Sequence, residues 1–143
     1  MTGLLRIWGL LLAGVLVAGC GVKAPPRPPE RKPPAAIRDL SGGIADGAVI
    51  LRWGIPPAGK TAGEAAGFAV YRSKTPLSEA ECRDCPLTFT QVAQATVTPS
   101  DREAGGMTFS EPLEKGFRYR YKLRGFDVFG AAGGASNNFS TDY

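Results

Sequence analysis

The chain has 143 residues, among them 19 glycines and 12 prolines, and a formal net charge of +4 at pH 7. It contains no histidine, which excludes a Ser-His-Asp triad, a Cys-His catalytic pair, a histidine-ligated metal and a c-type haem. The high glycine and proline content favours short strands joined by turns over long helices.

The first predicted element is a secretory signal peptide over residues 1–19. Arg6 gives it a weakly basic start, and residues 7–17 are almost wholly apolar, as is typical of such peptides. The apolar run is too short for a comfortable membrane-spanning helix, which needs about 20 residues. The alternatives are an ordinary signal peptide or a single membrane anchor with an incidental cysteine.

The signal peptide ends in Val17-Ala18-Gly19-Cys20. This sequence resembles the lipobox of bacterial lipoproteins, in which the cysteine becomes the lipidated N-terminus of the mature chain. The resemblance implies a lipid-anchored protein of the bacterial cell envelope, with no cofactor beyond the covalent lipid on Cys20. Gly21 follows the cysteine where an aspartate could stand, which resembles lipoproteins sorted to the outer membrane.

Residues 20–36 are predicted to form a basic, proline-rich tether. Half of all the prolines lie in residues 25–34, and such a composition favours polyproline II, which would reach roughly 40 Å over the segment. The stretch 21–34 carries a net charge of +3, whereas the chain from Ala35 onward has equal numbers of acidic and basic residues. The basic character therefore belongs to the tether, which suits anionic lipid and does not support nucleic-acid binding.

Two sharper interpretations of the tether stay open. It could be a proline-rich ligand for an aromatic groove of a partner. Its start, Cys20-Gly21-Val22-Lys23-Ala24-Pro25, is also similar to the Cys-Gly-x-Lys-Gly-Pro head of very short outer-membrane lipoproteins that assist maturation of the lipopolysaccharide translocon. That similarity implies an alternative role as an assembly or maturation factor for an outer-membrane machine.

Residues 37–143 are predicted to form an all-β domain. Val49, Leu51 and Trp53 alternate with other residues at period two, the pattern of a strand with one buried face. Further strands are expected at 67–73, within 88–97, at 107–111, at 117–124 and within 134–140. About seven short strands separated by turns indicate an antiparallel β-sandwich. Phe89 and Val92 are the apolar residues of the strand within 88–97, and Phe109 is expected to point into the core.

The segment Leu113-Glu114-Lys115-Gly116-Phe117-Arg118-Tyr119 is similar to the Leu-x-Pro-Gly-x-x-Tyr segment of fibronectin type III domains. The resemblance implies an immunoglobulin-like sandwich in which Tyr119 forms a tyrosine corner, with its hydroxyl bonded to nearby backbone. It also implies that Trp53 is the tryptophan of the second strand. Such domains imply a non-catalytic module that binds protein or glycan.

Cys82 and Cys85 lie in a predicted loop. In an oxidising compartment we expect them to form a small disulfide, which closes too short a ring to add much stability. A thiol redox helper is the alternative, although a thioredoxin-like pair needs a helix N-terminus after a strand. A zinc site would need two further ligands, so no metal site is predicted.

The predicted strand 117–124 carries a row of cations on its outward face, namely Arg118, Arg120, Lys122 and Arg124. Tyr71 is expected to face outward on the adjacent strand, where a guanidinium could lie over its ring. This surface could be a solvated face with cross-strand ion pairs. Alternatively, it binds an acidic partner such as lipopolysaccharide phosphates, an acidic glycan or an acidic protein.

No catalytic residue is predicted. The carboxylates are scattered over loops, whereas a glycosidase needs two at a fixed separation across a cleft. Serine and threonine have no histidine base, and no lysine lies where its pKa would be depressed. The sequence therefore predicts a non-enzymatic, membrane-anchored binding module of the cell envelope.

Overall fold

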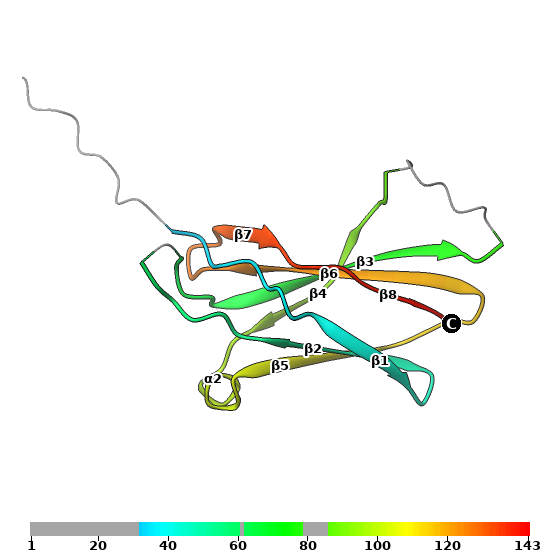
Figure 1. Ribbon diagram of the computed structural model, residues 1–143, viewed down its shortest axis with the longest axis horizontal. Coiled ribbons are helices and arrows are strands. Elements are labelled where there is room, and N and C mark those ends of the chain that lie inside the picture. The colour runs from blue at the N-terminus through cyan, green and yellow to red at the C-terminus, as the bar shows by residue number, and fades with distance from the viewer. Residues whose placement is uncertain (1–31, 61, 79–85) are drawn as a thin grey trace, which may run out of the picture. The chain divides into compact units, whose positions relative to one another are not determined.

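Two antiparallel β-sheets face each other across an apolar core (Figure 1). The computed structural model describes residues 32–60, 62–78 and 86–143, all within the unit Arg31–Tyr143. The predicted all-β antiparallel sandwich is confirmed. The predicted lipidation site Cys20 and the predicted disulfide of Cys82 and Cys85 lie outside the described residues.

The smaller sheet has the strand order β1-β2-β5 and the larger sheet has the order β4-β3-β6-β7, with β8 also paired to β6. The strands are β1 (Ser41–Ala45), β2 (Ala48–Gly54), β3 (Gly67–Pro76), β4 (Thr90–Thr96), β5 (Gly106–Pro112), β6 (Phe117–Phe126), β7 (Ala132–Ala135) and β8 (Phe139–Asp142). A short helix, α2 (Pro99–Ala104), connects β4 to β5.

Most of the core consists of residues of β2, β3 and β6, and Ile37, Leu40 and Ala65 complete it. β2 and β6 bury alternate side chains, whereas β3 buries its first four residues, so one face of each sheet is apolar. The large buried side chains of these three strands are Val49, Leu51, Trp53, Phe68, Val70, Tyr119, Tyr121 and Leu123. Phe109 of β5 also packs against this core, so its side chain points inward as the sequence predicts.

The chain that precedes β1 lies on the larger sheet. Pro34 is buried, and it forms an isolated parallel bridge with Gly63. Its carbonyl oxygen lies where a Cβ of Gly133 would be, so this approach requires glycine in β7. Pro33 and Pro34, which the sequence analysis assigns to the tether, therefore already contact the sandwich.

The last predicted strand, within 134–140, is two strands in the structure. The ladder to β6 is interrupted between β7 and β8, where Leu123 N donates to the side-chain Oγ of Ser136 at 2.8 Å. The next residue, Asn137, bonds the segment before β1 through its side chain. Its Oδ1 accepts a hydrogen bond from Leu40 N at 3.0 Å, and its Nδ2 donates to Leu40 O at 2.8 Å. Asn137 thereby clamps the segment before β1 onto the larger sheet.

Candidate binding surface

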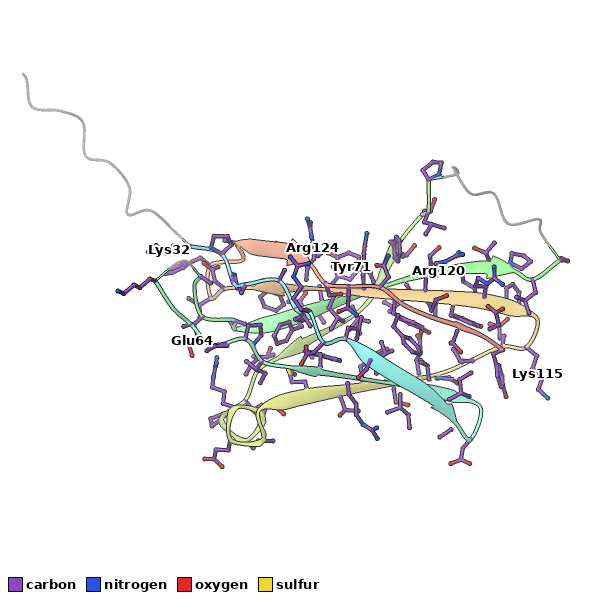
Figure 2. The ribbon with its side chains drawn as sticks, in the orientation of Figure 1. Lys32, Glu64, Tyr71, Lys115, Arg120 and Arg124 are labelled. Atoms are coloured by element: carbon purple, nitrogen blue, oxygen red, sulfur yellow. The ribbon has the colours of Figure 1, made fainter. Side chains whose placement is uncertain are left out.

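The outward face of β6 carries the predicted row of cations. Arg118, Arg120, Lys122 and Arg124 alternate along the strand with the buried side chains of Tyr119, Tyr121 and Leu123. Figure 2 shows Arg120, Arg124 and Tyr71 on the side of the larger sheet that faces away from β2 and β5. The strand alternation thus separates an apolar core face from a basic surface, which is called the β6 outer face below.

The end of this row at the start of β6 is neutralised by an ion pair. Arg118 donates from Nε to Asp142 Oδ1 at 2.7 Å and from Nη2 to Asp142 Oδ2 at 2.9 Å. These hydrogen bonds hold the pKa of the Asp142 carboxyl below its usual value. Arg118 and Arg120 also line a shallow hollow of about 440 Å³, together with residues 140–142 of β8.

Lys122 and Arg124 form the other end of the row. Lys122 lies over the ring of Phe89, with Nζ 3.9 Å from the ring centroid, a cation–π distance. In the part of the chain that the structure describes, neither Lys122 nor Arg124 has a carboxylate within ion-pair distance. Their positive charges are therefore available to an anionic group from outside the molecule.

Phe89 and Val92, the apolar residues that the sequence analysis assigns to the strand within 88–97, point to opposite sides of the larger sheet. Tyr71 pairs with Gln91, whereas Val70 pairs with Ala93, and the extra residue Val92 marks a bulge in β4. A bulge shifts the alternation of sides by one residue. Val92 consequently packs against the core, while Phe89 lies beside Lys122 on the β6 outer face.

Tyr71 lies between the two neighbouring strands, opposite Lys122 of β6 and Gln91 of β4. It is half-buried. Among the described contacts, the cation–aromatic pair on this face is that of Lys122 with Phe89, and no cation is placed over the Tyr71 ring. Tyr71 and Phe89 therefore add two aromatic groups to the basic row.

Two other cations of β3 lie on the opposite face and do not belong to this surface. Arg72 donates from Nη1 to Glu111 Oε2 at 3.0 Å, and Lys74 lies 2.9 Å from Glu114 Oε1 and 4.0 Å from the Phe117 ring centroid. The sequence analysis missed both contacts. The available signal was the alternation itself, which puts positions 72 and 74 on the same side as Phe68.

Tyr119 and Trp53 are buried in the interior of the sandwich. The Tyr119 hydroxyl accepts a hydrogen bond from Glu114 N at 2.9 Å and donates to Glu114 O at 3.2 Å. Trp53 is 3% exposed and packs edge-on against Phe68, with ring centroids 5.8 Å apart. Both side chains hold the sandwich together and neither reaches the β6 outer face.

The described residues offer little to other kinds of site. Within residues 32–60, 62–78 and 86–143, no group of three or more acidic or cysteine side chains could hold a metal ion. In these same ranges, no helix has both the length and the apolar character to cross a membrane.

No family model and no curated protein matches the sequence. The structure, in contrast, is similar to solved fibronectin type III domains. The third fibronectin III domain of the human KIAA0343 protein matches with a TM-score of 0.54 and 18% identity over 85% of this chain and 92% of that domain. The described domain has a fibronectin type III-like fold.

The twitchin kinase region from C. elegans, whose description includes the Fn31 domain, also matches this fibronectin type III-like domain. The TM-score is 0.54 and the identity is 17% over 77% of this chain. The chain spans only 16% of that multidomain structure. At these identities the likeness shows the fold alone, and function has to be argued from the residues of this chain.

Proposed function

We propose that the chain is a non-catalytic binding module, anchored in the bacterial envelope by a lipid on Cys20, that recognises acidic groups through the β6 outer face. Fibronectin type III-like domains are typically non-catalytic binding modules, and the fold is shared. The observation that carries the proposal is the pair Lys122 and Arg124, two cations on one strand face without a carboxylate partner in the described chain.

An acidic glycan fits this surface best. Arg124 is exposed and Lys122 is half-buried against Phe89, so charge and aromatic surface lie within one patch. Guanidinium and ammonium groups bind phosphate or carboxylate, while the rings of Phe89 and Tyr71 offer apolar area to the C–H groups of a sugar. Like charges at neighbouring positions also repel, and an anionic ligand would relieve that repulsion.

Charge reversal tests the binding surface. The fibronectin-like chain carrying Lys122→Glu and Arg124→Glu is compared with the unchanged chain for binding to purified lipopolysaccharide and to its dephosphorylated form. We expect binding at least about tenfold weaker in the variant, because two attractive contacts become repulsive. We also expect a steep dependence on ionic strength for the unchanged chain.

Arg52→Glu provides the matched control. Arg52 is exposed on β2 of the opposite sheet, so its reversal lowers the net charge by half the step of the double variant without touching the β6 outer face. If Arg52→Glu weakens binding as much as the double variant does, the effect is due to net charge and not to the β6 outer face. If the double variant binds as well as the unchanged chain, the proposal is wrong.

The lipid anchor has its own test. Cells that express the full chain are grown with radiolabelled palmitate, and the label in the protein is measured. We expect labelling of the unchanged chain and none of a Cys20→Ser variant, because acylation requires the thiol. Labelling that survives the substitution would disprove the anchor at Cys20.

A further inference from the structure

The turn between β6 and β7 presents two adjacent apolar side chains to solvent. Val128 is 79% exposed and Phe129 is 69% exposed, whereas the other large exposed apolar side chains of the described chain are between 39% and 44% exposed. Single exposed apolar residues are common on protein surfaces, but a pair at the tip of a turn is a typical contact element.

The turn is held in one conformation by its own hydrogen bonds. Asp127 Oδ1 accepts from Phe129 N at 2.9 Å and from Ala131 N at 2.8 Å. Gly130 N donates to Asp127 O at 3.0 Å, and Gly130 has a φ of 83°, which favours glycine. The two apolar side chains are thus presented by a preorganised backbone, which lowers the entropic cost of inserting them into another phase.

This turn lies at the end of the domain where the tether enters. Pro34 packs against Gly125 of β6 and Gly133 of β7, the strands that the turn connects. Figure 1 shows the described chain beginning beside this hairpin. The ammonium of Lys32 is also at this end, where it donates to the carbonyl oxygen of Lys60.

We propose that the β6–β7 turn is a membrane-contact tip, which inserts Val128 and Phe129 into the interfacial region of the bilayer. The proposal rests on the lipid anchor of the proposed function. The stretch from Cys20 to Lys32 spans no more than about 40 Å, so this end of the domain stays close to the lipid surface. An apolar tip at the end of the domain that also carries Lys32 is the chemistry that binds an anionic bilayer interface.

The tether favours a lipid bilayer over a partner protein as the binding partner of the β6–β7 turn. Its basic residues are attracted to anionic headgroups, which favours orientations of the domain with the tether end toward the lipid. The carboxylate of Asp127, the acidic group within the turn, is engaged by two backbone N–H groups. A protein pocket on a partner would not require the apolar tip to lie at the tether end.

The test uses the lipidated chain, purified from its host membrane and reconstituted in vesicles of phosphatidylcholine and phosphatidylglycerol that contain brominated acyl chains. Phe129→Trp places an indole at the tip, and bromine quenches its fluorescence on contact. Leu77→Trp is the matched control. Leu77 is 44% exposed and follows the end of β3 that pairs with the start of β6, roughly 30 Å along the strand from the turn.

We expect the fluorescence of the Phe129→Trp variant to be quenched at least about twofold more than that of the Leu77→Trp variant, after subtraction of the signal from Trp53 that both share. Replacing Val128 with serine in the Phe129→Trp background should reduce this quenching, since one anchor side chain is lost. Thermal unfolding of both variants is compared with that of the unchanged chain to confirm folding.

Flotation of the same vesicles separates this inference from the proposed function. A chain that floats with the vesicles but is quenched equally at both positions overturns the membrane-contact tip and leaves the anchor intact. That result would favour a pocket of a partner protein as the binding site of Val128 and Phe129. A chain with an intact Cys20 that fails to float disproves the lipid anchor, and it also overturns the membrane-contact tip, which depends on that anchor.

Discussion

The Tyr121 hydroxyl donates a 2.5 Å hydrogen bond to Glu111 Oε1 and so joins the two sheets through the interior of the sandwich. Arg72 occupies the other oxygen of the same carboxylate at 3.0 Å. The Glu111 side chain is 15% exposed, and a carboxylate with so little access to water requires such partners. One glutamate therefore links β5 to both β3 and β6.

Glu111→Ala should lower the free energy of unfolding by about 1–3 kcal/mol. The substitution leaves the buried Tyr121 hydroxyl without its acceptor, and an unsatisfied buried polar group costs about this much. Glu114→Ala is the control, because the Glu114 side chain is 73% exposed and an exposed ion pair contributes about 0–1 kcal/mol. Urea denaturation of both variants provides the measurement, and equal losses would contradict the role of the interior link.

The same contact predicts a loss of stability at high pH. Burial and the neighbouring Glu111 carboxylate raise the pKa of Tyr121 above its ordinary value of 10.0. Below pH 10 the folded and unfolded chains both hold the phenolic proton, so its contribution to stability is complete. Above pH 10 the unfolded chain loses the proton first, and stability should fall by about 1.4 kcal/mol per pH unit from this group.

Comparison with Tyr121→Phe isolates the effect. The difference in unfolding free energy between the unchanged chain and this variant, measured by urea denaturation at pH values from 8 to about 11.5, should shrink as the pH rises past 10. A difference that is constant over the whole range would show that Tyr121 does not titrate differently in the folded and unfolded chains.

The strands with a strict period of two were predictable from sequence. Val49, Leu51 and Trp53 of β2 are all buried, and β6 separates its apolar and basic faces as its sequence indicates. In both cases each residue has only two directions available, and the hydrophobic effect selects one. The same rule does not predict β1, because its sequence Ser-Gly-Gly-Ile-Ala has no alternation of apolar and polar residues and all five residues are exposed.

The candidate surface was only partly predictable because its composition depends on pairing between distant strands. The bulge at Val92 turns Phe89 outward, and only the register with β3 reveals it. Likewise, the partner of Arg118 is Asp142 of β8, which is 24 residues away in sequence. Helix α2 carried a local signal that was not used, the capping box of Thr98 and Asp101.

The Arg118–Asp142 pair should make an acid-dependent contribution to stability. The hydrogen bonds from Arg118 lower the pKa of Asp142 below 3.8, so the contribution is present above that pH and is lost as the pH falls through the lowered value. A carboxyl-detected NMR titration should give a midpoint for Asp142 below 3.8, and Arg118→Gln should raise it. A midpoint that Arg118→Gln leaves unchanged would show that the pair is not formed in solution.

Gly133→Ala should detach the segment that leads into β1 from the larger sheet. The added methyl group would meet the carbonyl of Pro34, and because this obstacle is backbone, the segment has to move as a whole. We expect a loss of about 1–3 kcal/mol of unfolding free energy, as for other overpacked positions, together with faster amide exchange at Ala35 to Ile37. Gly43→Ala is the control, since no atom lies within 4 Å of its added Cβ. An alanine at position 133 that is tolerated as well as one at position 43 would contradict the close approach of Pro34, and with it the placement of the tether beside the β6–β7 turn.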